Sequence, residues 1–298
     1  MMPQRQRGAV LLMVSIVLAT VAALAVAVNQ LASVESRSTH GDYEGRAATY
    51  LADAGVAAAR WTNQVAGCTS RTIAPTALGS GTFSADVPAV PGKAKTLDII
   101  ATGAVTGGIA RTLQRKQVTL SDLSKIESVR LTNNARDITI DVLQSESDDD
   151  DERLWLRFEG AHALLFWGMN DIKTDAKVLS ATLTLTPYGS NGTGGTVAVQ
   201  RVTTRWDDNA TWSRPREEVT RWNGGNYVDQ PAAVATVAGS ATSEWDLTDL
   251  VDGWFTGQLP NYGILLRLAK PAPTVIFHSL DASSSRSPAL QVLFARRC

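Results

Sequence analysis

The sequence predicts an α+β region, with a long N-terminal helix and a small antiparallel sheet, followed by an all-β sandwich. Three observations predict this order of elements. An uninterrupted apolar run lies near the N-terminus, small and apolar residues at helical spacing follow it, and short alternating runs separated by turn residues fill the rest of the chain. The 298 residues leave room for one to three domains besides a membrane anchor.

The composition indicates which classes of function to set aside. The chain carries 28 Lys and Arg against 29 Asp and Glu, whereas a nucleic-acid-binding domain usually has a clear basic excess, so no nucleic acid partner is expected. The sequence contains no G-x-S-x-G, H-E-x-x-H, P-loop or C-x-x-C motif, and its three histidines are scattered. We therefore expect a protein that is not an enzyme and needs no catalytic cofactor.

The N-terminal segment predicts the anchor. Residues 1–8 form a basic leader, and residues 9–28 are apolar without a charge. A helix of about 20 residues spans the bilayer core, so this run is expected to cross a membrane. Arg5 and Arg7 precede the run, which predicts export of the remainder. A cleaved secretory signal is the alternative, because Ala25 and Ala27 form a small-x-small pair.

Residues 29–122 are expected to form the rest of the long helix and a small sheet. The helix is predicted to continue to Trp61, with a bend or break at Gly41. The stripe expected to pack on the sheet consists of Ala47, Leu51, Ala54, Ala58 and Trp61. Three strands are predicted within residues 81–88, 95–103 and 110–120, with turns at Pro91-Gly92 and Gly107-Gly108.

This region resembles type IV pilin-like proteins, specifically minor pilins of the PilX N-terminal type. Gln6-Arg7-Gly8 before the apolar run and the Leu-Ala-Asp-Ala-Gly sequence of residues 51–55 carry the resemblance. It implies cleavage by a prepilin peptidase between Gly8 and Ala9, N-methylation of Ala9, and assembly with other pilins and pilus assembly proteins through the helix. It also implies a bacterial inner-membrane protein with a periplasmic soluble part, which reaches the pilus or cell surface after assembly.

Met13 is a departure from this pattern, because major pilins usually carry glutamate at the fifth residue after the cut. A glutamate buried in an apolar bundle is retained only when it is paired. Its absence argues against a bulk structural subunit and favours a low-copy or tip-located pilin. An ordinary uncleaved single-pass anchor is the alternative.

Residues 128–296 are predicted to form a β-sandwich, of the jelly-roll type, because short strands recur with Asn-Gly and Gly-Gly turns between them. The sequence around residues 121–127 marks the boundary with the preceding region. One helix is expected within residues 245–257, where Asp246 is available as the N-cap. Its apolar positions, expected to plug the sandwich, are Leu247, Leu250, Val251 and Trp254.

This stretch resembles a DNRLRE-type domain, a family of carbohydrate-binding modules. The W-D-x-T-x-L-V-x-x-W motif from Trp245, the N-x-G-I-L-L motif from Asn261 and the F-x-S-x-D motif from Phe277 carry the resemblance. It implies a jelly-roll sandwich that binds extracellular polysaccharide. The acidic insertion at residues 145–152 is particular to this chain.

Tryptophans in polar sequence suggest where a sugar would bind. A flat aromatic face stacks on a pyranose ring, while carboxylates and amides bind its hydroxyls. The predicted binding residues are Trp206, Asp207, Asp208, Asn209, Trp212, Trp222 and Asn223. Core packing is the alternative for the three tryptophans, because large aromatic residues are mostly buried in sandwiches.

Two further features involve oxygen donors and cysteines. Calcium takes about 6 to 8 oxygen ligands, and the candidates for such a structural site are Asp148, Asp149, Asp150, Asp151 and Glu152. A solvated loop is the alternative, because the glycine and the spacing of an EF-hand are missing. Cys68 and Cys298 are the only cysteines, and a disulfide between them suits an exported protein, with two unpaired thiols as the alternative.

Three functions remain open. The first is a minor pilin or pilus-associated protein that presents a carbohydrate-binding sandwich for surface adhesion. The second is a single-pass membrane-anchored glycan-binding module that does not enter a filament. The third is a secretion-system pseudopilin whose sandwich binds protein. Processing at Gly8 distinguishes the second from the other two, and glycan binding distinguishes the first from the third.

Overall fold

A computed structural model describes residues 41–144, 151–189, 194–216, 221–283 and 285–298. The protein is mostly β, with several antiparallel sheets, and it divides into two compact units between Leu120 and Ser121. The leader, the apolar run, Gly8 and Ala9 lie outside the described residues. Within the described part of the chain, no helix is both long and apolar enough to cross a membrane.

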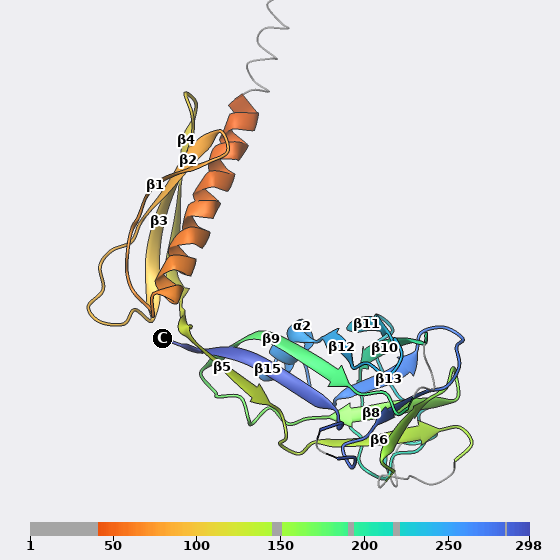
Figure 1. The fold of residues 1–298 in the computed structure, drawn as a ribbon. Coiled ribbons are helices and arrows are strands. Elements are labelled where there is room, and N and C mark those ends of the chain that lie inside the picture. Colours follow the sequence, from red (N-terminus) through yellow and green to blue (C-terminus); the bar gives the residue numbers. More distant parts are fainter. Residues whose placement is uncertain (1–40, 145–150, 190–193, 217–220, 284) are drawn as a thin grey trace, which may run out of the picture. The chain divides into compact units, whose positions relative to one another are not determined.

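The first unit contains a helix of residues 41–65 and one four-stranded antiparallel sheet (Figure 1). The strands, in the order in which they pair, are β1 (Ile73–Leu78), β2 (Gly81–Asp86), β3 (Thr96–Val105) and β4 (Ala110–Thr119). Strands β2, β3 and β4 lie where the sequence predicts them. Strand β1 was not predicted. It contains Pro75, which an edge strand tolerates on its unpaired side.

The helix packs on the sheet through a different face from the predicted one. Its most deeply buried positions are Ala48, Ala52, Gly55, Ala59 and Asn63, at steps of three and four residues. Of the predicted stripe only Leu51 is buried, and Trp61 is 62% exposed. The prediction of the packing face was therefore wrong, because the sheet contacts the helix where the side chains are smallest.

Glycine permits this close contact. A Cβ atom at Gly103 of β3 would overlap the backbone of Ala48 and Ala52, and one at Gly55 would lie 2.9 Å from the carbonyl oxygen of Ser84 and 3.1 Å from the Cβ of Ala101. Both distances are below normal carbon contacts, so larger residues would force the helix away from the sheet. The helix backbone thus rests almost directly on β2 and β3.

Asn63 connects the end of the helix to the first strand. Its side chain is fully buried, and its amide nitrogen donates to the carbonyl oxygens of Ala59 (2.8 Å) and Arg71 (3.0 Å). Its side-chain oxygen accepts from the Thr69 hydroxyl and from the Arg71 amide, both at 2.6 Å. Every hydrogen-bonding group of the carboxamide therefore has a partner, which fixes the turn after the helix.

The second unit contains two larger antiparallel sheets and a two-stranded ribbon. The five-stranded sheet, in pairing order, contains β11 (Ala233–Thr236), β10 (Thr196–Arg201), β13 (Ile264–Leu268), β8 (Ala161–Phe166) and β6 (Arg136–Asp141). The four-stranded sheet contains β12 (Ser243–Asp246), β9 (Ala176–Leu185), β15 (Ala289–Arg297) and β5 (Ser121–Arg130). The ribbon pairs β14 (Val275–His278) with β7 (Arg153–Leu156). Residues 121–127, expected at a boundary, directly follow the division between the two units and begin β5.

One apolar core lies between the two larger sheets. Inward residues of the five-stranded sheet, such as Leu165, Val199 and Leu266, belong to the same buried cluster as Leu183 and Val292 of the four-stranded sheet. Alternate residues along each strand face this cluster, as expected for strands of period two. This arrangement is compatible with a β-sandwich.

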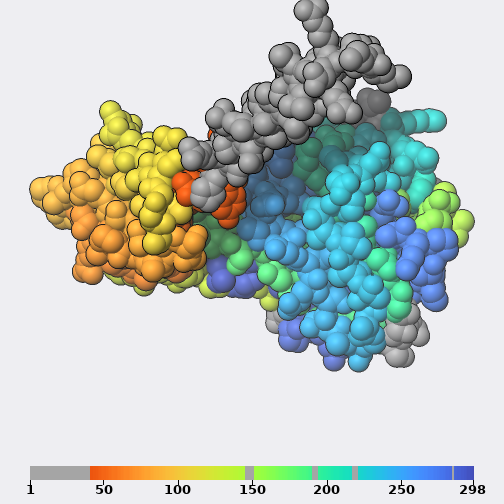
Figure 2. Space-filling model, turned by 90° about the horizontal axis from the view of Figure 1, so that it is seen from above, coloured from red at the N-terminus to blue at the C-terminus, as the bar shows by residue number. Residues whose placement is uncertain are grey.

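Helix α2 (Thr248–Phe255) completes this core. The four predicted apolar positions, Leu247, Leu250, Val251 and Trp254, are all buried in it. Asp246, however, is not the N-cap, because Leu247 occupies that position. Asp246 lies one residue earlier and accepts hydrogen bonds from the Thr248 amide (2.9 Å) and hydroxyl (2.6 Å). Figure 2 shows the region around residue 250 in light blue on the surface of the second unit.

Replacing Gly103 with alanine should destabilise the first unit by about 1 to 3 kcal/mol, because the added methyl overlaps helix backbone that has no flexible side chain to move. Urea unfolding of the full chain in detergent, followed by the helical signal in circular dichroism, measures this change, because the helix of residues 41–65 is much longer than α2 of the second unit. Gly45→Ala is the control: its methyl meets only the Arg111 side chain at 3.7 Å, and helix propensity predicts a gain of up to about 1 kcal/mol. Equal effects of the two substitutions would contradict the close contact.

Neither Cys68 nor Cys298 is a free thiol. That the two sulfurs form one bridge remains a prediction. Protease digestion without reductant should give a single linked pair of peptides, one containing each cysteine, which separates on reduction. Two alkylated peptides from the non-reduced protein would refute the pairing.

Candidate functional site

The outer face of the five-stranded sheet carries a second, smaller apolar cluster. Ile138, Ile140, Leu164 and Leu265 point away from the main core and are nonetheless buried. The chain between β10 and β11 covers them with Val202, Trp206, Ala210 and Trp222. Residues that follow β10 in sequence therefore form a third layer over this sheet, and the candidate site lies at its edge.

Two of the three predicted sugar-binding tryptophans belong to this covering layer. Trp206 is 1% and Trp222 6% exposed. Their indole N–H groups donate to the backbone oxygens of Tyr262 (2.8 Å) and Thr211 (2.7 Å), so both are fully satisfied inside the protein. The structure thus favours core packing for these two residues. Their polar sequence neighbours point outward while the rings point inward.

Trp212 and Asn223 form a separate pair. The Trp212 indole donates to the Asn223 side-chain oxygen at 2.8 Å, and its ring lies 4.9 Å from the ring of His162. Gly224, with φ +71°, is required beneath this ring, because a Cβ there would lie 2.8 Å from two of its carbons. Trp212 is half-buried and Asn223 is exposed.

His162 packs against the ring of Trp212 in this pair. Its Nδ1 donates to the Gly224 carbonyl oxygen at 2.7 Å. Burial lowers the pKa of His162, the Gly224 hydrogen bond opposes that effect, and the nearby charge of Arg267 adds to it. A neutral imidazole therefore packs against the indole of Trp212.

The remaining predicted residues follow Trp206 in a turn. Asp207 accepts a hydrogen bond from the Asn209 amide at 3.1 Å, a local turn contact. Asp208 is exposed, and one of its oxygens lies 3.9 Å from Nε of Arg136. Of the seven predicted residues, only Trp206 and Asp208 line a cleft on this surface.

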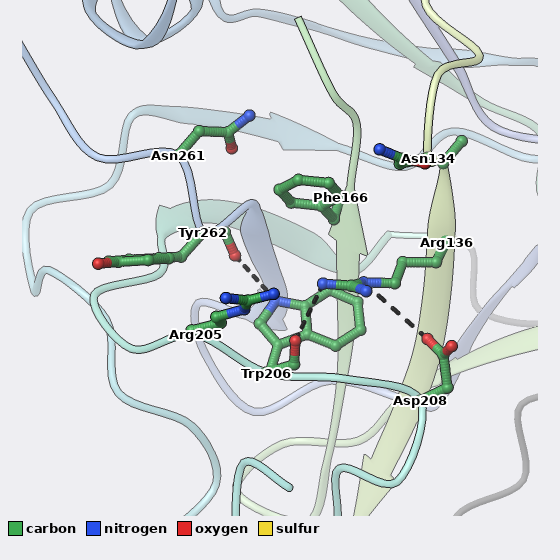
Figure 3. Close-up of a pocket in the computed structure, with 9 residues that line it drawn as sticks. Asn134, Arg136, Phe166, Arg205, Trp206, Asp208, Asn261 and Tyr262 are labelled. Atoms are coloured by element: carbon green, nitrogen blue, oxygen red, sulfur yellow. Dashed lines mark hydrogen bonds and ion pairs between the residues drawn. The ribbon is translucent and has the colours of Figure 1, made fainter. Parts of the chain in front are cut away.

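A cleft of about 490 Å³ opens beside Trp206 (Figure 3). It is lined by Asn134, Ala135, Arg136, Phe166, Arg205, Trp206, Asp208, Asn261 and Tyr262. Arg136 comes from β6, Phe166 from β8 and Asn134 from the turn between β5 and β6, whereas the other polar groups come from the covering layer and the connection before β13. The cleft is therefore built from segments that are distant in sequence.

Arg136 occupies the centre of this cleft. Its guanidinium carbon lies 4.8 Å from the centre of the Phe166 ring and 4.9 Å from the Trp206 ring. One terminal nitrogen donates to the Trp206 carbonyl oxygen at 3.0 Å. A planar cation held between two aromatic rings keeps its orientation, so its other terminal N–H groups present fixed donors, whereas Nε is buried.

The chemistry of the cleft suits a hydroxylated ligand. Its lining offers guanidinium donors, a carboxylate acceptor at Asp208, the exposed amide of Asn134 and aromatic surface from Phe166 and Tyr262. Two arginines against one carboxylate give it a positive balance, which favours a ligand that carries an acidic group. Sequence patterns missed Arg136, Phe166, Arg205 and Tyr262, because nothing in their local sequence connects them.

The predicted calcium ligands are only partly described. Asp148, Asp149 and Asp150 lie outside the described residues. Asp151 accepts from Nε of Arg153 (2.9 Å) and from the Trp155 indole (3.0 Å), so its oxygens serve structural contacts. The backbone oxygen of Glu152 accepts a hydrogen bond from the Ser279 amide. Within the described ranges, no group of three or more His, Cys, Asp or Glu residues could hold a metal ion.

One carboxyl group next to Arg136 in sequence is buried. Asp137 is 6% exposed and accepts the Leu280 amide at 2.9 Å. Burial raises the pKa of Asp137 to about 7, the Leu280 hydrogen bond opposes this effect, and the charge of Asp281 adds to it. Below neutral pH this buried group is therefore an uncharged carboxylic acid.

The comparisons with known proteins add no relatives. No protein-family model matches the chain, and no curated protein is similar to it.

Replacing Asp137 with asparagine should remove a pH dependence of stability. The folded pKa lies above the ordinary value of 3.8, so the stability that Asp137 supports is complete below about pH 4 and is lost as the pH rises towards 7. Relative to the wild type, Asp137→Asn should gain unfolding free energy across this window, with a limiting slope of about 1.4 kcal/mol per pH unit. Seven of the eight tryptophans lie in the second unit, so urea unfolding by tryptophan fluorescence measures it.

The exposed Asp229 provides the control for this comparison. Asp229→Asn removes a carboxylate from the same unit without freeing a buried group. The quantity to compare is the difference in unfolding free energy between each variant and the wild type. If this difference does not change between pH 4 and pH 7 for Asp137→Asn, or changes equally for both variants, the assignment is contradicted.

Proposed function

We propose that the chain is a minor pilin or pilus-associated protein that presents a carbohydrate-binding β-sandwich for surface adhesion. The observation that carries the proposal is the first unit: an apolar run behind Gly8 leads to a helix that packs through alanine and glycine on its own four-stranded sheet. A second unit follows with an aromatic, arginine-lined cleft. Anchor, helix and sheet precede the binding unit in the order that this function requires.

We infer that the second unit is a jelly roll. Strands β5, β15, β9 and β12 of one sheet face β8, β13, β10 and β11 of the other. Successive strands cross between the two sheets at β5 to β6, β8 to β9, β9 to β10, β11 to β12 and β12 to β13. This strand order supports two Greek keys, with β6 added beside β8.

The cleft at Arg136 is the proposed glycan site. Jelly-roll domains use shallow surfaces of this kind to hold sugars, whose rings stack on aromatic faces and whose hydroxyls need several fixed donors and acceptors. Phe166, Tyr262 and the oriented guanidinium of Arg136 supply these features. Extracellular polysaccharide bearing carboxylates is the partner that the two arginines favour.

Processing at Gly8 is the first test. Mass spectrometry of sheared pili should find this chain with an N-methylated Ala9 at its terminus, in low amount relative to the main pilin. Gly8→Glu, which alters the cleavage position, should abolish that form, whereas Gly41→Ala should leave it unchanged. A chain that keeps Met1 and stays in the membrane fraction would support the unprocessed anchor instead.

Glycan binding is the second test. Arg205 is exposed at the cleft. Arg205→Ala should therefore weaken binding to an acidic polysaccharide by about tenfold, which is a loss of about 1.4 kcal/mol of binding free energy. The melting temperature should not fall, because the side chain is exposed. Added salt should weaken the wild type as well. Lys270→Ala removes an exposed cation elsewhere in the unit and should bind normally.

The same measurement separates the alternative functions. Equal retention of Arg205→Ala and the wild type would exclude the cleft as the site. Binding of no polysaccharide by a processed chain would favour the pseudopilin with a protein-binding head.

A further inference from the structure

The helix of the first unit has a second apolar stripe, on the side away from its own sheet. Tyr43, Tyr50 and Trp61 are 69%, 72% and 62% exposed, although aromatic side chains are usually buried. Tyr50 lies two residues from both Ala48 and Ala52, and at 3.6 residues per turn this puts it nearly opposite the buried face. The sheet therefore cannot be what these aromatic residues pack on.

The spacing of the stripe indicates the shape of its partner. Its members are Tyr43, Ala47, Tyr50, Ala54, Ala57 and Trp61, which alternate steps of four and three residues. This is the heptad spacing by which one helix packs along another, with large residues inserting between small ones. A flat sheet or an irregular loop requires no such repeat.

A hollow next to the stripe could receive a large side chain. It measures about 510 Å³ and is lined by Asp53, Val56, Ala57, Arg60, Trp61, Gln64, Arg115 and Val118. Trp61 forms one rim, and β4 contributes Arg115 and Val118 to the other. A protruding indole and a hollow therefore lie side by side on one surface, as a symmetric pair of copies requires.

We propose that this stripe binds the same helix of a second copy of the chain, in parallel. Both copies carry the apolar run of residues 9–28 before the helix, so two chains anchored in one membrane have their helices pointing the same way. In a parallel, in-register pair the flanking Arg46, Asp53 and Arg60 face positions 51, 58 and 65 of the other copy, which are uncharged. No like charges meet, and each Trp61 lies beside the hollow of its partner.

The orientation rests on the proposed membrane anchor, whereas pairing itself does not depend on pilus assembly or glycan binding. The test uses the full chain in membrane vesicles, with the photo-reactive residue p-benzoylphenylalanine in place of Tyr50. Irradiation should give a product of twice the chain mass, whose joined peptides both come from residues 41–65. The control places the probe at Leu78, which is 51% exposed on β1 of the same unit, and should give none.

A second variant shows whether the stripe holds the pair together. Trp61→Ser, combined with the probe at Tyr50, should lose most of the joined product, while circular dichroism stays unchanged because Trp61 is exposed. Joined product in equal amount from Leu78, or undiminished product with Trp61→Ser, would overturn the proposal. Products formed only with other proteins, or none at all, would overturn it too. A chain found with Met1 intact would refute pilin processing, but the joined product at Tyr50 would still be expected.

Discussion

The burial of Trp206 is the contact on which the outer surface of the second unit depends. Its ring fills the space over Ile138, Leu164 and Leu265, and its indole donates to the Tyr262 backbone. Its own carbonyl oxygen accepts from Arg136 of β6. One residue thus joins the chain after β10, the edge strand β6 and the connection before β13. Burying an indole of this size stabilises by several times RT, so the covering layer is held firmly.

The cleft follows from this contact rather than from a binding motif. Because Trp206 faces the sheet, Arg205 just before it is exposed to solvent, and the turn that follows Trp206 brings Asp208 to the same cleft. The other face of the ring supports the guanidinium of Arg136, with Phe166 on the opposite side. A guanidinium fixed in this way loses little side-chain freedom when it binds a ligand. The same packing that stabilises the layer therefore prepares the donors.

Sequence patterns were reliable where a single element determines its own burial. The spacing of Leu247, Leu250, Val251 and Trp254 is enough to place all four in the core, because a short helix has one way to turn its apolar side inward. Strands β2, β3 and β4 were predicted from short strand-like runs separated by Pro-Gly and Gly-Gly turns, which are also local signals. The N-cap was off by one, since a local aspartate contact fits either register at the start of a helix.

The site was not predictable in this way. Tryptophans amid aspartate and asparagine look exposed, yet whether the ring or its neighbours turn inward depends on the apolar outer face of a sheet whose strands lie far away in sequence. Arg136 and Phe166 belong to that sheet and become cleft residues only when the covering layer packs on it. Tertiary packing here overrides the local pattern.

The packing face of the long helix was not predictable from the sequence either. The helix has two apolar faces, and the sequence does not say which one packs on the sheet. The deciding constraint is distance. Gly103 and Gly55 bring helix and strand backbones together, and only alanine-sized side chains fit at such a separation. The face with Ala48, Ala52 and Ala59 satisfies this condition, whereas Tyr50 or Trp61 at the interface would hold the helix off the glycines. Selection of the small face by the sheet is thus the reason that the aromatic residues remain outside.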